Sequence, residues 1–291
     1  MTVPSPLYRL TGEPAPPAPV LVVALEGWID AGLAGGTAMA SLFEAVESSP
    51  YAVFDTGDLL DQRARRPKLK IVDGINDGIE WPQVTLSVGT DRLGSGIAML
   101  AGPEPDMHWQ SFSDAVVELS SALEVRLMVG FGGFPAAAPH TRPVKLAATA
   151  SDGHLAQKIG FIPGPIEVPA GIQAVIERAC SKAGIASVGL WARVPHYVAA
   201  MPFPAASVAL LDGLASLTGL VIDSHVLSEA ADGARARVDE LIAQSSEHQE
   251  MVRQLEQQID ELEGRPVLLD DRGVPSGEEI AAELERYLRG Q

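Results

Sequence analysis

Side chains that could transfer protons or hold an anion occur in four short segments, each of which follows an apolar stretch. The segments contain one aspartate, two histidines and two arginines, and arginine suits planar oxyanions. Because ligands of open parallel sheets bind beyond the carboxyl ends of the strands, we expect these segments to share one edge of a sheet. They are residues 27–32, 130–135, 139–143 and 193–197, and the ligand-binding candidates are Gly27, Trp28, Asp30, Gly32, Gly132, His140, Arg142, Arg193 and His196.

A purely structural interpretation of the same residues stays open. In it the glycines shape turns, Asp30 caps the helix that follows, and the prolines stiffen the loops. Trp28 has two interpretations as well, since an aromatic ring beside a glycine loop is either a stacking surface or a plug over the core. We prefer the structural interpretation, because no catalytic motif defines the geometry of the four segments.

Several well-known sites are excluded because their motifs are missing. The sequence has no Gly-x-x-x-x-Gly-Lys-Ser/Thr phosphate loop, no His-Glu-x-x-His zinc helix and no Gly-x-Ser-x-Gly nucleophile elbow. The six histidines lack the spacing of metal ligands. Cys180, the single cysteine, is interpreted as a small buried hydrophobe rather than a nucleophile. We therefore predict no metal site and no cofactor, and we favour a protein that is not an enzyme.

Composition and charge limit the class of partner. The 291 residues are 46% hydrophobic, enough for a buried core, and carry a net charge of −17. Such an acidic chain is a poor partner for nucleic acid or an anionic membrane, and we interpret the basic run at 63–68 as a solvated loop. The sequence shows no secretory signal pattern and no apolar run of about 20 residues, so we expect a soluble, cytoplasmic protein with no membrane partner.

The apolar stretch at residues 20–25 organises the rest of the chain. Its Val and Leu residues show no polar alternation, as in a strand that is covered on both faces of a parallel sheet. Strand, glycine-rich loop and helix then recur, which predicts a three-layer α/β/α domain with a mostly parallel or mixed sheet. Further strands are predicted at 51–54, 68–72, 79–88, 97–100, 125–129, 145–150 and 186–192, and helices at 33–46, 109–123, 171–183 and 204–217.

These patterns divide the chain into an extended, proline-rich lead-in at 1–19, the α/β/α domain at 20–227 and a helical extension at 228–291. In the extension we predict one long helix at 230–263, about 50 Å in length at 1.5 Å per residue, and a final helix at 277–289. Residues of the long helix recur at spacings of four and three, the seam of a coiled coil that must pair with another surface. The seam comprises Leu241, Ser245, His248, Val252, Leu255, Ile259 and Leu262, and its five apolar members are the interface candidates.

Three segments resemble the proteasome assembly chaperone family, in the branch of the second assembly chaperone. They are Gly27-Trp28-Ile29-Asp30-Ala31-Gly32, Gly130-Phe131-Gly132-Gly133-Phe134-Pro135 and Pro139-His140-Thr141-Arg142-Pro143, of which the first is the most specific. The acidic helical tail and Pro275-Ser276-Gly277-Glu278-Glu279 are similar to actinobacterial members. The resemblance covers residues 18–220 for the family domain. It implies a three-layer fold similar to that of purine nucleoside phosphorylases, a helical extension and self-association.

Two functional hypotheses follow. The first is a non-enzymatic, self-associating scaffold or chaperone-like protein, a homo-oligomer whose protein partner is proteasome-related, as the family resemblance implies. The second is a binder of a small nucleoside-like or anionic ligand, or a vestigial phosphorylase- or hydrolase-type enzyme, which would use Asp30, His140 and Arg142 at the sheet edge. The four segments show no phosphorylase-type set of phosphate and purine ligands, so the first hypothesis is favoured.

Overall fold

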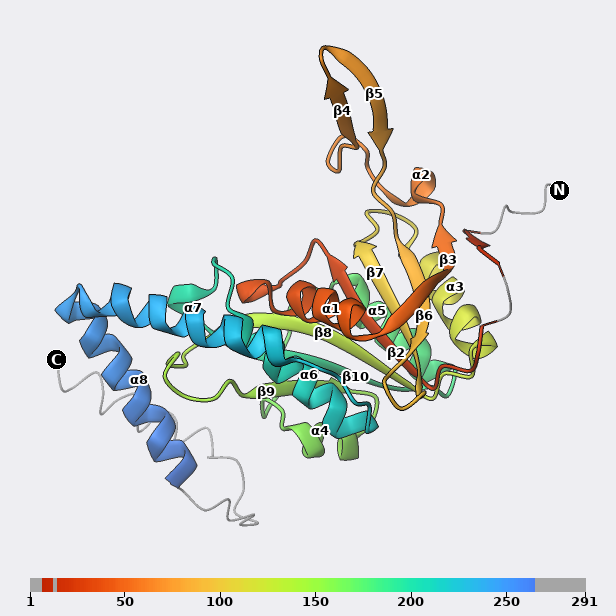
Figure 1. Cartoon of the computed structure of the whole chain (residues 1–291). Coiled ribbons are helices and arrows are strands. Elements are labelled where there is room, and N and C mark those ends of the chain that lie inside the picture. The colour runs from red at the N-terminus through yellow and green to blue at the C-terminus, as the bar shows by residue number, and fades with distance from the viewer. Residues whose placement is uncertain (1–6, 13–14, 265–291) are drawn as a thin grey trace. The chain divides into compact units, whose positions relative to one another are not determined.

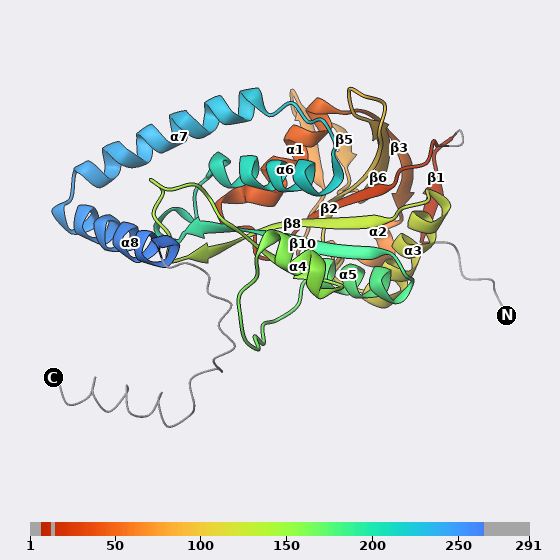
Figure 2. The same cartoon turned by 90° about the horizontal axis from the view of Figure 1, so that it is seen from below.

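The computed structural model describes residues 7–12 and 15–264. The chain divides into two compact units, Met1–Glu256 and Gln257–Gln291. In the first unit an eight-stranded sheet has helices on both of its faces (Figures 1 and 2). This arrangement confirms the predicted three-layer α/β/α fold with a mixed sheet.

Four parallel strands form the middle of the sheet. In spatial order they are β7 (Gly96–Pro103), β2 (Val20–Glu26), β8 (Leu127–Ala136) and β10 (Ala186–Pro195). Antiparallel strands extend the sheet beyond both ends of this group: β6 (Thr85–Thr90), β3 (Glu47–Phe54) and β1 (Tyr8–Leu10) beyond β7, and β9 (Leu146–Ala150) beyond β10. The first five residues of β2 are buried on both faces of the sheet, which explains their unbroken apolar sequence.

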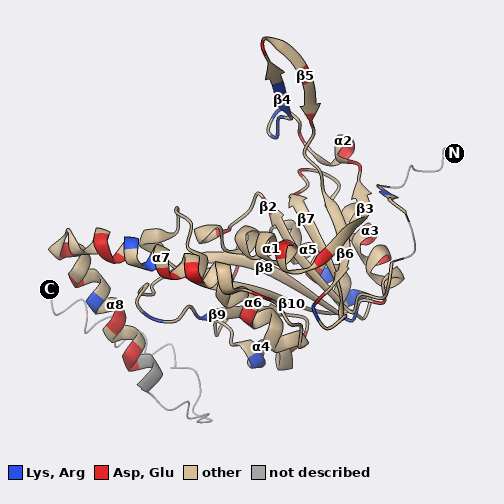
Figure 3. Cartoon of the chain, viewed as in Figure 1, with Lys and Arg blue, Asp and Glu red and all other residues tan. Residues whose placement is uncertain are grey.

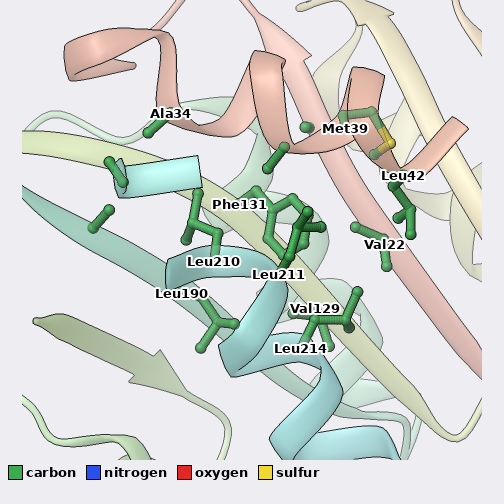
Figure 4. Packing of buried hydrophobic residues seen from close by; sticks show 14 of the residues in the cluster. Val22, Ala34, Met39, Leu42, Val129, Phe131, Leu190, Leu210, Leu211 and Leu214 are labelled. Atoms are coloured by element: carbon green, nitrogen blue, oxygen red, sulfur yellow. The ribbon is translucent and has the colours of Figure 1, made fainter. Parts of the chain in front are cut away.

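Two hydrophobic cores lie between the sheet and its helices. One face is covered by α1 (Ala34–Ala45) and α6 (Pro204–Thr218), with α7 (His225–Ala243) packed on α6; the other is covered by α3 (Trp109–Ala122) and α5 (Ile172–Lys182). Alternate residues of β2 serve the two cores, since Val22 belongs to the first and Val23 to the second. Figure 4 shows the first core, where Val22, Phe131 and Leu190 from three strands gather with residues of α1 and α6.

The first unit also contains several short elements. They are the helices α2 (Thr56–Leu59) and α4 (Gly153–Ile159), the 3-10 turns η1 (Ala31–Leu33) and η2 (His196–Val198), and a separate two-stranded sheet of β4 (Lys68–Val72) and β5 (Ile75–Glu80).

The prediction of a glycine loop at 130–135 is wrong, because these residues continue strand β8. Gly130 to Pro135 pair in parallel register with Gly189 to Val194 of β10. The glycines do not turn the chain here; they leave room for neighbours. A Cβ at Gly130 would collide with the side chain of Gln173, and one at Gly132 would collide with the ring of Trp191. The predicted segment at 193–197 likewise begins as the end of β10 and continues into η2.

The single strand predicted at 79–88 is also wrong, because two strands, β5 and β6, cover this stretch. Strand β4 pairs with β5, through a turn in which Asp73 and Gly74 both have positive φ, while β6 joins the main sheet. The tight turn needs only two residues, so the return strand begins earlier than the apolar pattern indicated.

The single long helix predicted at 230–263 is wrong as well. The structure has two helices, α7 and α8 (Ser246–Gly264), separated by a turn at Gln244 and Ser245. The Ser245 hydroxyl oxygen accepts a hydrogen bond from the His248 backbone N–H at 3.3 Å, which is how serine caps a new helix. Ser245, which the pattern placed on the seam, therefore marks the boundary between α7 and α8.

The seam residues do not share one face of a helix. Leu241 is 53% exposed, because α7 packs on the core through Leu227 and Val238 instead. Val252 and Leu255 are buried on α8. Two further members, Ile259 and Leu262, belong to α8 beyond Glu256, and the final helix predicted at 277–289 lies outside the described residues.

The predicted domain limits shift at both ends. Strand β1 lies within the predicted lead-in of residues 1–19, where it pairs with β3 and belongs to the main sheet. The first compact unit continues to Glu256, so the predicted boundary after residue 227 does not separate two units. Helix α7 stays with the sheet domain because its apolar face completes the core over α6.

Candidate functional site

Asp30 holds the start of helix α1. Its Oδ1 accepts a hydrogen bond from the Gly35 N–H at 2.7 Å, and its Oδ2 accepts one from the Gly36 N–H at 3.0 Å. The preceding loop needs glycine at residue 32, where φ is +68° and a Cβ would lie 2.9 Å from Cβ of Phe203. The structural interpretation of Asp30 as a helix cap is therefore confirmed.

Glu104 plays the corresponding part at helix α5, and the sequence patterns did not single it out. This buried side chain follows β7, and its Oε1 accepts a hydrogen bond from the Ile172 N–H at 3.0 Å. Burial raises the pKa of Glu104. Asp30 and Glu104 line one small recess of about 40 Å³. Helix N-termini favour anions. At the starts of α1 and α5, however, the backbone N–H groups already donate to the carboxylates of Asp30 and Glu104, which argues against an anionic ligand in the recess.

His140 is a docking residue for helix α7. Its backbone N–H donates to the Tyr197 hydroxyl oxygen at 2.8 Å, and that hydroxyl lies 2.7 Å from Nδ1 of the same histidine. Its Nε2 lies 2.9 Å from the Asp239 carboxylate on α7. The hydroxyl can then donate to Nδ1, which leaves the Nε2 proton for Asp239. Burial raises the pKa of Tyr197 to about 12, so the phenol stays protonated at neutral pH.

The other predicted candidates that carry charged or imidazole side chains make contacts with residues other than Asp30. Arg142 pairs with Glu256 on helix α8 at 3.2 Å, and Thr141 also donates to Glu256. His196 is exposed and contacts the Tyr197 ring edge to face, with ring centroids 5.4 Å apart. Arg193 lies in β10, where its backbone N–H donates to the Lys145 backbone carbonyl oxygen at 3.0 Å.

The expected single cluster of acid, base and guanidinium groups is thus divided. Asp30 contacts the strand residue Gly133 through an isolated parallel bridge and belongs to the start of α1. His140 and Arg142 instead hold α7 and α8 onto the loop that follows β8. Asp30, His140 and Arg142 thus make contacts that maintain the fold. None of these contacts joins two of the three residues in an arrangement for proton transfer.

A large apolar groove lies along helix α5. Its volume is about 970 Å³, and it is bounded by α5, by strands β9 and β10, and by residues 160–171, here called the strap. Trp28 is 41% exposed and lines both this groove and the small recess, so it is not a plug over the core. Gly27 and Gly132 shape the surroundings: Gly27 faces the Arg65 guanidinium, and Gly132 faces the ring of Trp191.

Three side chains that line the groove form a short hydrogen-bonded chain. The Thr149 hydroxyl donates to Glu177 Oε2 at 2.9 Å and accepts from Trp191 Nε1 at 3.3 Å. Burial raises the pKa of Glu177. One turn earlier on α5, Gln173 Nε2 is buried without a hydrogen-bond partner among the described residues. The spacing of Gln173 and Glu177 could have revealed their shared helix face, but nothing in the pattern placed β9 opposite it.

A second unusual surface is the hairpin of β4 and β5, here called the arm. It projects from the sheet domain at the top of Figure 1. Every residue of both strands is exposed. Large apolar side chains are among them: Leu69 is 52% exposed, Ile71 61%, Ile75 71% and Ile79 50%. Basic residues gather in β4 and in the loop before it (Figure 3).

Within residues 7–12 and 15–264, no three His, Cys, Asp or Glu side chains are grouped so as to hold a metal ion. Over the same residues, no helix combines the length and the apolar character required to cross a bilayer.

The topology and the glycine-lined strand ends can be compared with known proteins. A family model described as the PAC2 family matches residues 24–242. The chain belongs to the PAC2 family. The match includes the Asp30 loop, the glycine-rich half of β8, the groove and most of α7. A comparison with curated proteins found no match to the chain.

Two solved structures are more than 30% identical in sequence to this chain. The Mycobacterium tuberculosis protein Rv2714, described as of unknown function, is 35% identical, with a TM-score of 0.81 over 90% of this chain and 93% of that one. The proteasome-assembly chaperone homologue Rv2125 of the same organism is 33% identical, with a TM-score of 0.75 over 80% of this chain and 99% of that one.

A more distant structure shares the fold alone. Pyrococcus furiosus PbaB, described as an archaeal proteasome activator, is 14% identical, with a TM-score of 0.63 over 80% of this chain and 97% of that one. The PAC2 fold thus accommodates large differences in sequence.

Proposed function

We propose that this PAC2 family protein is a non-enzymatic, self-associating scaffold with a chaperone-like role, which holds protein partners through exposed apolar surfaces. The observation that carries the proposal is the arm, where Leu69, Ile71, Ile75 and Ile79 are all at least half exposed. An isolated two-stranded hairpin is marginally stable in water, and its outer edges offer unpaired backbone groups. Such an arm gains stability when another chain covers it.

The family relationship supports the same class of function. Rv2125, a proteasome-assembly chaperone homologue, covers four fifths of this chain. That description favours proteasome subunits as the first partners to test. Helix α7 offers a second contact surface, because Val226 is 75% exposed and Leu241 53% exposed on its outer side.

The alternative of an anionic or nucleoside-like ligand has less support. Asp30 and Glu104 already occupy the starts of α1 and α5, so a phosphate would have to displace a protein carboxylate. The carboxylates of Asp30 and Glu104, which line the small recess, would also repel a phosphate. His140 and Arg142 are held by Asp239 and Glu256 instead of facing a shared pocket.

Native mass spectrometry of the full chain tests self-association. We expect an oligomer for the parent protein and a lower subunit number for the double variant Ile71→Ser, Ile75→Ser. The matched control is Leu93→Ser, which removes an equally exposed apolar side chain, at 76%, from the turn between β6 and β7. The control should keep the parent mass. A monomeric parent, or an arm variant with the parent subunit number, would contradict the proposal.

A pull-down with proteasome subunits tests the partner class. The parent and Leu93→Ser should retain the subunits, and the arm variant should retain less. Capture that is equal for all three proteins would show that the arm is not the contact surface, and absence of capture by the parent would remove proteasome subunits as partners.

A further inference from the structure

Three polar atoms converge above Gly189, on the side of the sheet that α5 covers. A Cβ at residue 189 would lie 2.6 Å from Thr149 Oγ1, 2.9 Å from Trp191 Nε1 and 3.2 Å from Glu177 Oε2. Thr149 stands opposite Gly189 in the register of β9 and β10, and Glu177 reaches the same point from α5. Because residue 189 has no side chain, the Glu177 carboxylate can approach the sheet.

One oxygen of that carboxylate remains open to the groove. Oε2 accepts the hydrogen bond from Thr149, whereas Oε1 accepts none from the described residues. Buried side-chain atoms that lack a partner there belong to Gln173, Arg193 and Ser207, and Glu177 is not among them. Glu177 Oε1 is thus unpaired within the described part of the chain and accessible from the groove that its side chain lines.

The charge of Glu177 is not neutralised by the chain around it. Among the described residues, no cation forms an ion pair with this carboxylate. Arg178 follows it in α5 and also lines the groove, but neighbouring residues of a helix do not face each other. Burial raises the pKa of Glu177 by more than the hydrogen bond from Thr149 lowers it. A positive group of a ligand would offset this cost of burial, and a negative group would add to it.

Apolar side chains form much of the remaining wall. Trp28, Phe134 and Trp191 contribute aromatic rings, and the strap contributes Ile166 and Val168, which are 54% and 72% exposed. Prolines limit the backbone freedom of the strap, so its apolar side chains are held in place before a ligand arrives. The groove volume of about 970 Å³ is typical of a site for a small molecule.

We propose that the groove binds a small amine, a molecule with one protonated nitrogen and an apolar body. The ammonium group donates to Glu177 Oε1, and the body packs on Trp191, on Phe134 and on the strap. A metal ion would need further ligands, which the described residues do not group there. The inference goes beyond the scaffold function and does not depend on it.

Isothermal titration calorimetry of the full chain compares three probes that share one hydrocarbon chain: octylamine, octanol and octanoate. At pH 7 octylamine is protonated, as lysine is, and octanoate is ionised. We expect one octylamine per chain, bound at least about tenfold more tightly than octanol, because a hydrogen bond to a charged group contributes that much. Octanoate should bind more weakly than octanol. Equal affinity for octylamine and octanol, tighter binding of octanoate, or no binding of octylamine would overturn the proposal.

The variant Glu177→Gln removes the charge and keeps the shape. Its amide oxygen still accepts from Thr149, so the groove should stay formed and should bind octanol as the parent does. Octylamine should fall to the affinity of octanol. Octylamine affinity equal to that of the parent would overturn the proposal.

The matched control is Glu240→Gln, which removes the same charge from an exposed residue of helix α7. It should bind octylamine as the parent does. A loss equal to that of Glu177→Gln would show a general attraction of cations to an acidic protein and would overturn the proposal.

A variant of the strap tests where the apolar body lies. Val168→Ser should weaken octylamine and octanol alike, by about threefold, because buried apolar surface is lost. Leu93→Ser is its control, since both side chains are more than 70% exposed, and it should bind both probes as the parent does. Unchanged affinity of Val168→Ser for both probes would contradict the location in the groove.

A peptide separates a small amine from a lysine side chain of a partner protein. Acetyl-Gly-Lys-Gly-amide carries an alkylammonium group on a peptide backbone, and it should not displace octylamine. Displacement at equal concentrations of the two would overturn the small-molecule proposal in favour of a protein lysine.

The groove and the arm are tested independently. The groove variants should keep the native mass of the parent, and the arm variant Ile71→Ser, Ile75→Ser should keep its octylamine affinity. An oligomer that loses subunits with the arm but binds no octylamine would retain the scaffold and remove the groove inference. A monomer that binds octylamine through Glu177 would do the reverse.

Discussion

The indole ring of Trp191 lies over Gly132 of the neighbouring strand, so closely that a Cβ at residue 132 would come within 2.5 Å of ring atom Cζ3. This contact forms part of the wall where the sheet meets the groove, because Trp191 also donates from Nε1 to Thr149. A glycine that looked like part of a loop is thus required within a strand to accommodate an aromatic side chain.

The first prediction concerns that contact. Gly132→Ala should lower the free energy of unfolding by about 1–3 kcal/mol, because the ring must shift within a packed site. Urea unfolding followed by tryptophan fluorescence measures the loss. Gly153→Ala is the matched control, since a Cβ there meets nothing within 4 Å and the residue begins helix α4. A control as destabilised as Gly132→Ala would contradict the steric explanation.

A second prediction follows from the cap at helix α1. Asp30→Ala should cost about 1–2 kcal/mol, because the Gly35 and Gly36 N–H groups lose their acceptor. Asp30→Asn should cost less, since the amide oxygen still accepts one of the two hydrogen bonds. Thermal unfolding of the two variants provides the comparison. Equal losses for Asn and Ala would show that the carboxylate acts through charge rather than through hydrogen bonds.

Asp91 provides the pH prediction. Burial alone would raise its pKa, but hydrogen bonds from Val221, Ser95 and Leu93 outweigh burial and lower the pKa below the ordinary value of 3.8. The folded state therefore binds this proton less readily than the unfolded state. The resulting stability is present above about pH 4 and is lost as the pH falls through the folded-state pKa.

Asp91→Asn should accordingly cost about 1–3 kcal/mol at pH 7, and its difference from the parent should shrink below pH 4. Chemical unfolding between pH 3 and pH 7 measures this dependence. Asp212→Asn, at an exposed residue of helix α6, is the control and should follow the parent at every pH. A cost for Asp91→Asn that stays constant down to pH 3 would contradict the assignment.

His140 provides a prediction about local stability. His140→Gln breaks the link from Tyr197 to Asp239, so helix α7 should open more easily from the sheet domain. Amide hydrogen exchange should quicken in α7 while the central strands keep their protection. His225→Gln, at an exposed histidine at the start of the same helix, should leave the exchange unchanged. Uniform acceleration across the sheet would instead indicate global destabilisation.

Much of the architecture was predictable from the sequence. The unbroken apolar run of β2 required burial on both faces, and its recurrence with helices predicted the three-layer mixed sheet. The cap at Asp30 was predictable too, since aspartate before a helix is a local signal. Such features depend on residues close together in the chain, and the sequence alone determined them.

Contacts between distant residues required the tertiary structure. Gly132 resembled a turn residue until Trp191, 59 positions later, was placed over it by the β8 and β10 register. His140 resembled a sheet-edge base until α7 brought Asp239 to its ring, 99 positions away. The groove depends on β9, α5 and the strap meeting at one end of the sheet. Pattern and spacing report only local periodicity, whereas packing decides which distant side chains meet.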